Sequence, residues 1–207
     1  MVIRTIADFA PDGVEAGVGL ALQDDTGRYI FFLAGTRYLC PPGELFYAGI
    51  GGHREADEDW LMCAHREAKE EIGTDVDILP ASATWYIPQR GPVQRIKVSD
   101  KPRPFAFYEM IHRPGTPRAG GLYCIVIYKA HLHNTPEDLP PDELQGVIAL
   151  IKEQVVQGLE RKPTLTELLN EGALLLAEVE RVDRQTRLYP VGTAAALAHV
   201  LSHINEA

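Results

Sequence analysis

The chain has 207 residues, of which 45% are hydrophobic and 24% are charged, so it can bury the core of one ordinary globular domain. Its formal net charge of −9 argues against nonspecific binding to nucleic acid or to an anionic membrane surface. The three cysteines form no C-x-x-C pair and no long apolar stretch is present, so we expect a cytoplasmic protein that does not span a membrane.

The first predicted elements are two strands, residues 14–22 and 28–34, joined by a turn at 24–27. The turn sequence Asp-Asp-Thr-Gly separates two apolar runs, as is typical of a hairpin. A proline-rich loop and a short apolar piece at 45–47 then lead into a group of glycines, whose backbone a ligand can approach closely.

A helix is predicted for residues 57–72, with acidic and apolar residues on opposite faces. Glu67, Glu70 and Glu71 stand at i, i+3 and i+4, so their carboxylates share one face and repel one another. The opposite face carries the apolar stripe of Leu61, Ala64, Ala68 and Ile72. Gly73 stands where a left-handed C-terminal cap is expected. Because Mg²⁺ binds carboxylate oxygens together with substrate phosphates, the acidic face predicts a metal site.

Four further strands are predicted after this helix, at residues 76–79, 83–87, 104–111 and 122–133. The cations between the second and third of these strands are Arg90, Arg95, Lys97, Lys101 and Arg103. Guanidinium groups suit bidentate contact with phosphate, so Arg90 and Arg95 are candidates for binding an anionic substrate. A solvated basic loop explains the same residues equally well.

The last part of the chain is predicted to form three helices, at about residues 142–160, 164–179 and 192–204. Thr164 and Glu167 fit a capping box for the middle helix, and a threonine at 193 fits the cap of the last one.

The stretch 52–74 resembles the Nudix box, the signature of the Nudix hydrolase family, written G-x5-E-x7-R-E-U-x-E-E-x-G-U with U an aliphatic residue. The seven fixed positions are filled by Gly52, Glu58, Arg66, Glu67, Glu70, Glu71 and Gly73. At average residue usage, a chance match is on the order of 10⁻⁸ per starting position. Ala68 and Thr74 depart from the aliphatic positions, and Ile50 replaces the proline that is usual before the glycines.

The resemblance implies an α/β fold, in which a mixed β-sheet lies between helices as an α/β/α sandwich. The box helix would cover one face and extra C-terminal helices the other. We expect residues 1–160 to form the Nudix domain, and residues 161–207 to form a C-terminal helical extension packed on the same domain.

By the same resemblance, the metal ligands are the Gly51 carbonyl and the carboxylates of Glu67, Glu70 and Glu71. Glu67 and Glu70 are also the catalytic candidates within the box, because the general base of the family often lies there.

Other residues take supporting roles. The structural positions of the box are Gly52, Glu58, Arg66 and Gly73. Glu58 is expected to support the helix, and Arg66 to hold the glycine-rich loop through carboxylate and carbonyl partners. Glu143 is a candidate for a general base or extra ligand outside the box, although a solvated helix N-terminus also explains its charge. Arg37 follows a strand after which the family often places a basic residue, so it is a candidate for binding a substrate phosphate.

The implied function is Mg²⁺-dependent hydrolysis, with Mn²⁺ as an alternative ion, of the diphosphate linkage in a nucleoside diphosphate derivative. ADP-ribose or another nucleotide sugar is the first choice. ADP-ribose-hydrolysing members tend to have a proline at a set distance past the box glycine, and Pro88 lies one residue short of that place.

Two alternatives remain open. A non-catalytic nucleotide sensor with this fold would usually lose box carboxylates, and this chain keeps them all. A diphosphate isomerase would need a nucleophilic cysteine, for which Cys40 and Cys124 are available. The expected partner is a small-molecule nucleotide rather than nucleic acid or membrane. Residues 161–207 leave a homodimer contact, a lid or extra packing open.

Overall fold

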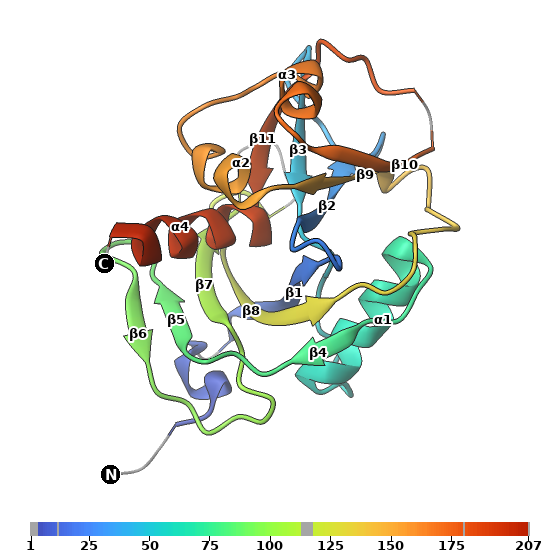
Figure 1. Cartoon of the computed structure of the whole chain (residues 1–207). Helices are drawn as coiled ribbons and strands as arrows, with labels where there is room; N and C mark the ends of the chain where they lie inside the picture. The colour runs from blue at the N-terminus through green and yellow to red at the C-terminus, as the bar shows by residue number, and fades with distance from the viewer. Residues whose placement is uncertain (1–3, 12, 113–117, 180, 207) are drawn as a thin grey trace.

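The structure, a computed structural model, describes residues 4–11, 13–112, 118–179 and 181–206, and these form a mixed β-sheet between helices (Figure 1). Helix α1 (Trp60–Ile72) covers one face of the sheet, and helix α4 (Thr193–Glu206) covers the other. The predicted α/β/α arrangement is confirmed. No helix of the described chain combines the length and the apolar character that crossing a membrane requires.

Eleven strands of the described chain join one sheet, in the order β10-β9-β2-β1-β8-β7-β5-β6, with β3 and β11 attached beside β2 and β4 beside β8. Their bounds are β1 Glu15–Gln23, β2 Tyr29–Ala34, β3 Glu44–Ala48, β4 Asp77–Leu79, β5 Thr84–Ile87, β6 Gln94–Ile96, β7 Ala106–Ile111, β8 Leu122–His131, β9 Leu144–Leu150, β10 Leu174–Glu178 and β11 Arg187–Val191. Three short helices complete the described elements: η1 Ile6–Phe9, α2 Lys152–Gln157 and α3 Leu165–Asn170. The pairs β1–β8, β5–β7 and β3–β11 are parallel, so the sheet is mixed as predicted.

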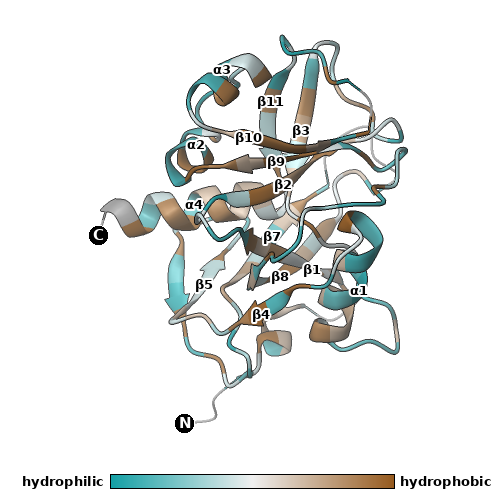
Figure 2. Cartoon of the chain, turned by 45° about the vertical axis from the view of Figure 1, so that its right-hand side comes forward, coloured by the Kyte–Doolittle hydropathy of each residue, from teal (hydrophilic) through white to brown (hydrophobic). Residues whose placement is uncertain are grey.

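Two hydrophobic clusters fill the two sides of the sheet, and β8 contributes alternate residues to each. Ile125 and Ile127 belong to the cluster under α4, whereas Cys124 and Val126 belong to the cluster under α1. This alternation follows from the two-residue period of a strand. In Figure 2 the middle strands of the sheet are largely hydrophobic, whereas the outer side of α1 is hydrophilic.

Local capping sets the ends of the box helix. The Asp59 carboxylate accepts hydrogen bonds from the backbone N–H groups of Leu61 and Met62 at 2.9 and 2.8 Å, so α1 begins at Trp60 rather than at 57. Gly73 ends the helix with φ +69°, as predicted, and its N–H donates to the Lys69 carbonyl.

The predictions of two C-terminal helices are wrong over about half of their length. The range 142–160 contains strand β9 before the short helix α2, and the range 164–179 contains helix α3 before strand β10. Strand β9 is buried on both faces and therefore reads as a continuous apolar run, which periodicity cannot distinguish from a buried helix. Gly172, at φ +109°, separates α3 from β10.

Besides β9 and β10, three more strands fall where no strand was predicted: β3 at the short apolar piece, β6 inside the basic loop, and β11 before the last helix. Strand β11 pairs with β3, and β10 pairs with β9, so the segment after residue 160 enters the sheet and is not purely helical. The predicted domain boundary at 160 stays a prediction.

Candidate active site

A cavity of about 570 Å³ opens where the glycine-rich loop, α1, the turn after β2 and the start of α4 meet. Its acidic lining residues are Glu55, Glu67, Glu70, Glu71 and Glu143, and its arginines are Arg37, Arg54 and Arg66. Opposite charges from distant parts of the chain therefore face one space.

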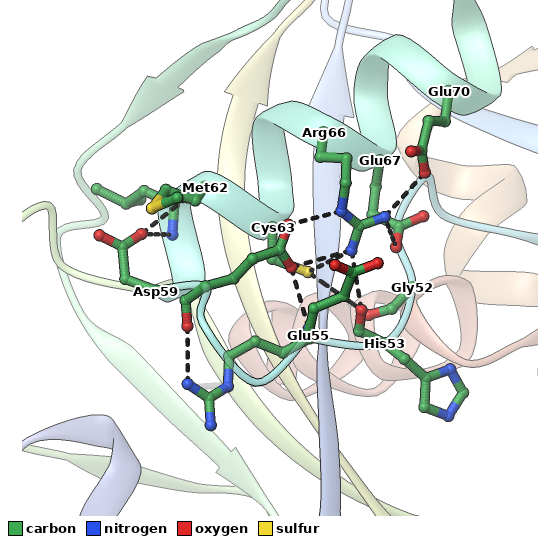
Figure 3. Close-up of polar contacts among 12 residues, drawn as sticks. Gly52, His53, Glu55, Asp59, Met62, Cys63, Arg66, Glu67 and Glu70 are labelled. Carbon is green, nitrogen blue, oxygen red and sulfur yellow. Dashed lines mark hydrogen bonds and ion pairs between the residues drawn. The ribbon is translucent and has the colours of Figure 1, made fainter.

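Arg66 holds the box together through one guanidinium group (Figure 3). Its Nε and one terminal nitrogen donate to both oxygens of Glu58, at 2.6 and 3.0 Å, and that nitrogen also donates to the His53 carbonyl at 3.0 Å. The other nitrogen donates to Glu67 and to Glu70, each at 2.8 Å. The hydrogen bonds from Arg66 lower the pKa of Glu58 to about 2, so this carboxylate stays ionised at neutral pH.

The glycine-rich loop passes so close to other backbone that side chains cannot fit. Gly51 has φ +141°, and a Cβ there would stand 2.2 Å from the Val18 carbonyl oxygen. A Cβ on Gly52 would stand 2.4 Å from a carboxylate oxygen of Glu67. These two glycines let the loop backbone lie directly against the carboxylates of α1.

Glu71 is the most deeply buried carboxylate of the cavity, with 5% of its surface exposed. One of its oxygens accepts a hydrogen bond from the Gly51 N–H at 2.9 Å. Burial raises the pKa of Glu71 to about 8, and the Gly51 N–H opposes that rise in part. A cation beside Glu71 would favour its ionised form.

Glu67 and Glu70 differ in environment although one guanidinium contacts both. Glu67 is 9% exposed, and burial raises its pKa while the charge of Arg66 opposes the rise. The Glu70 side chain lines the cavity as well but is 58% exposed.

Arg37 and Glu143 both line the cavity and form an ion pair with each other. Arg37 comes from the turn after β2, and Glu143 from the residue before β9. The Arg37 guanidinium also donates to the Tyr38 hydroxyl at 2.8 Å. The predicted substrate contact, Arg37, and the candidate base, Glu143, therefore bind each other.

Comparison with protein families finds that the NUDIX domain model matches residues 14–162, well over half of the chain. The chain belongs to the Nudix family. Members of this family are pyrophosphohydrolases that act on small diphosphate-containing molecules and typically use a divalent metal. Comparison with curated proteins gives no significant match.

Among solved structures, this Nudix chain is similar to the MutT protein from Methanosarcina mazei Go1, with a TM-score of 0.52 and 8% identity over 96% of this chain and all of that one. It also matches a Nudix hydrolase from Nitrosomonas europaea, at TM-score 0.46 and 16% identity over 76% and 87% of the two chains. An Ap4A hydrolase from C. elegans matches at TM-score 0.43 and 18% identity, over 70% and 85%. The first of these likenesses supports the fold.

The donor set of the Nudix site fits a hard divalent cation. Three box carboxylates, Glu143 and the nearby Gly51 backbone offer oxygen only, which is the donor type that Mg²⁺ and Mn²⁺ prefer. No three His, Cys, Asp or Glu side chains of the described residues already converge in metal-binding geometry. Figure 3 shows that Arg66 engages both Glu67 and Glu70.

The predicted site residues divide into two groups by position. Those that line the cavity are Arg37, Gly51, Gly52, Arg66, Glu67, Glu70, Glu71 and Glu143, while Glu58 and Gly73 support it from α1 and its flanks. Arg90 and Arg95 lie outside this cavity, and Arg95 lines a separate one. Their predicted contact with substrate has no support from this geometry.

Several lining residues were not predicted as site residues. They are Tyr38, Phe46, Arg54, Tyr123 and Thr193. His53 also lines the cavity, and the centroid of its ring lies 4.7 Å from that of the Tyr123 ring. A Cβ on Gly19 would stand 1.9 Å from the Thr193 hydroxyl, so this glycine lets the first residue of α4 lie close against β1.

Proposed function

We propose that this Nudix protein uses Mg²⁺, or Mn²⁺, to hydrolyse the diphosphate linkage of a nucleoside diphosphate derivative. The observation that carries the proposal is that Glu67, Glu70, Glu71 and Glu143 line one cavity with the backbone of Gly51. A carboxylate set of this kind attracts divalent cations and, through them, the oxygens of a diphosphate.

The ligands in this proposal are the carboxylates of Glu67, Glu70 and Glu71 and the Gly51 carbonyl. When bound, the metal neutralises charge on the diphosphate and lowers the pKa of a water molecule. Glu71 is pre-positioned for the role by the Gly51 N–H, and its burial leaves it few other partners.

Glu58 and Arg66 act as positioning residues. The guanidinium of Arg66 ties the helix to the loop through Glu58 and the His53 carbonyl. These contacts remain available after Glu67 and Glu70 turn toward a metal, because they use a different terminal nitrogen of Arg66.

Arg37 and Glu143 are proposed to separate when substrate binds. A phosphate oxygen competes with the Glu143 carboxylate for the Arg37 guanidinium, since both make charge-assisted hydrogen bonds. Release of Glu143 would leave a free carboxylate at the cavity mouth, able to accept a proton from the attacking water. Glu67 and Glu70 are the competing candidates for this base.

ADP-ribose or another nucleotide sugar is the proposed substrate class. A cavity of about 570 Å³ falls within the range that accommodates a small ligand. Its lining includes the aromatic side chains of Phe32, Tyr38, Phe46 and Tyr123, which offer flat apolar surface beside the charged groups.

The two alternatives find less support. A nucleotide sensor needs no full set of carboxylates, and this site keeps four of them. An isomerase needs a reactive thiol, but Cys40 and Cys124 do not line the cavity, and burial raises the pKa of Cys124 to about 11.

The deciding experiment measures phosphate-containing products from a panel of nucleotide sugars, dinucleoside polyphosphates and nucleoside triphosphates, with Mg²⁺ and with Mn²⁺. We expect turnover of at least one diphosphate compound, fastest with a nucleotide sugar, and none in the presence of EDTA. Tight binding without turnover of any panel member would favour the sensor instead.

A further inference from the structure

A second cavity, of about 520 Å³, lies at the edge of the sheet. It is lined by residues 82–84, residues 95–98 and Arg103, none of which lines the catalytic cavity. Strand β6, which supplies part of it, is the last strand in the sheet order, and Figure 1 places it at the margin opposite α1.

Three cations line this second cavity, and none of them pairs with a carboxylate in the part of the chain that the structure describes. Within the described residues, Arg95 and Lys97 form no ion pair, and Arg103 donates only to the Ser82 carbonyl, at 2.9 Å. Yet Asp and Glu outnumber Lys and Arg by 29 to 20 in the chain. Arg161 and Arg184, in contrast, each bind a glutamate at 2.9 Å or less.

The chemistry of these three side chains indicates which kind of ligand the cavity would bind. Two guanidinium groups and one ammonium group offer donors in several directions, and guanidinium matches the oxygens of a phosphate in pairs. Gathered around a concavity, the three charges repel one another unless an anion lies between them. We propose that the cavity between Arg95, Lys97 and Arg103 is a second binding site, separate from the catalytic one, for a small phosphate-bearing anion.

Protection of the sheet edge is the competing explanation, because charged side chains on an outer strand discourage pairing with another chain. That role needs charge along β6 but not a cavity, and it does not involve Arg103, which lies outside the strand. Nucleic acid is disfavoured as the ligand because the net charge of −9 repels a long polyanion.

The test uses tripolyphosphate as the probe and the melting temperature as the readout. All proteins carry Arg37→Gln to weaken anion binding in the catalytic cavity, and all samples contain EDTA at constant ionic strength. The test variant is R95Q/K97Q. The matched control is R90Q/K101Q, which changes net charge equally at two exposed residues of the same segment that line neither cavity.

We expect tripolyphosphate to raise Tm with saturation in the parent and in R90Q/K101Q, and the rise to be lost in R95Q/K97Q. Backbone amide NMR shifts on titration should centre on residues 82–84 and 94–98. If R95Q/K97Q folds poorly, Lys97→Gln alone should lower the apparent affinity at least threefold.

Any of three results overturns the proposal: no response in the parent, an equal loss in both double variants, or a response that survives R95Q/K97Q. Aggregation of R95Q/K97Q with an intact response would assign the charges to edge protection. Binding of a short single-stranded oligonucleotide without binding of tripolyphosphate would replace the small anion by nucleic acid.

Discussion

The ion pair between Arg37 and Glu143 joins a residue suited to phosphate with a residue suited to proton transfer. Both side chains are partly exposed, at 46% and 31%, so their pairing contributes little to stability and can be exchanged for a contact with substrate. The proposed exchange would make the two residues energetically dependent on one another during turnover.

Arg37→Gln is expected to raise KM with a smaller change in kcat, because the lost phosphate contact exists in both the ground and transition states. Glu143→Gln is expected to lower kcat by roughly a hundredfold if its carboxylate is the base. Steady-state kinetics of both single variants and the double variant measure the coupling. Strictly additive effects would show that the pair does not act through exchange.

Glu71→Gln is expected to reduce turnover by roughly a hundredfold or more, because it removes a buried ligand from the metal clamp. The same change should leave Tm in EDTA equal or higher. Burial disfavours the ionised form of the Glu71 carboxylate, and the amide that replaces it carries no charge. Glu160→Gln, at an exposed carboxylate away from the cavity, is the control for both measurements. Near-normal turnover of Glu71→Gln at saturating Mg²⁺ would remove Glu71 from the ligand set.

The box residues could be predicted from sequence because their chemistry is local. Glu67, Glu70 and Glu71 share a helix face at fixed spacing, and Gly52 precedes that helix by a short loop. That Arg90 and Arg95 lie outside the cavity could not be predicted, because positive charge in a loop does not reveal which edge of the sheet the loop follows. That information resides in the pairing of β6 with β5, which depends on residues far from the arginines.

Gly73 fixes the end of helix α1. Its positive φ ends α1, and a Cβ there would stand 2.3 Å from the Glu137 carbonyl oxygen. Gly43 has nearly the same torsion, φ +72°, but nothing lies within 4 Å of its would-be Cβ.

Gly73→Ala should therefore destabilise the fold more than Gly43→Ala. The left-handed torsion alone costs an alanine roughly 1–2 kcal/mol, and the clash at Gly73 adds to that cost. Urea denaturation of the two variants gives the difference. Equal losses would mean that the chain near Glu137 moves aside freely.

Strand β10 ends in an ion pair whose effect depends on pH. Both oxygens of Glu178 accept from Arg184 at 2.9 Å, and these hydrogen bonds lower the pKa of Glu178 below its usual value. As the pH falls, the unfolded chain takes up this proton before the native protein does. The pair therefore stabilises the fold above the usual glutamate pKa and loses its effect as the pH falls through the lowered one.

Glu178→Gln is expected to cost about 0.5–1 kcal/mol at neutral pH, the size typical of an exposed pair. The difference from the parent should shrink toward zero in strong acid. Denaturation at a series of pH values measures it, with Glu160→Gln as the comparison, because Glu160 forms no ion pair with any described residue. A difference that persists unchanged in acid would point to a packing effect.

Helix α1 was predictable because one of its faces is exposed and the other is buried. Strands β1, β2 and β8 are buried on both faces over most of their length, but the turn residues between β1 and β2 and the Val, Ile and Tyr content of β8 were enough to place them. Strand β9 is buried on both sides, so its apolar run carries no period. Strand β11 contains Pro190, which disfavours strand from sequence alone but is tolerated in the outermost strand beside β3.

For the molecule as a whole, divalent metal should act as a stabilising ligand. Binding at a hundred times Kd adds about 2.7 kcal/mol, which for a chain of this size is roughly 5–10 °C in Tm. Thermal melts in EDTA and in excess Mg²⁺ or Mn²⁺, matched in ionic strength with KCl, measure the shift. Glu71→Gln should lose most of it, and a shift of equal size in that variant would place the metal elsewhere.

The end of β11 and the start of α4 form one side of the catalytic cavity, and this arrangement affects when the cavity can form during synthesis of the chain. Val191, Gly192 and Thr193 line the catalytic cavity, and β11 reaches its place by parallel pairing with β3, far earlier in the chain. Long-range pairing of this kind forms late in folding. A nascent chain whose box helix has already left the ribosome still lacks one side of its cavity. Assays of ribosome-stalled chains ending before residue 187 should therefore find bound metal without hydrolysis, so translation itself would delay the enzyme's activity until residues 187–193 have left the ribosome.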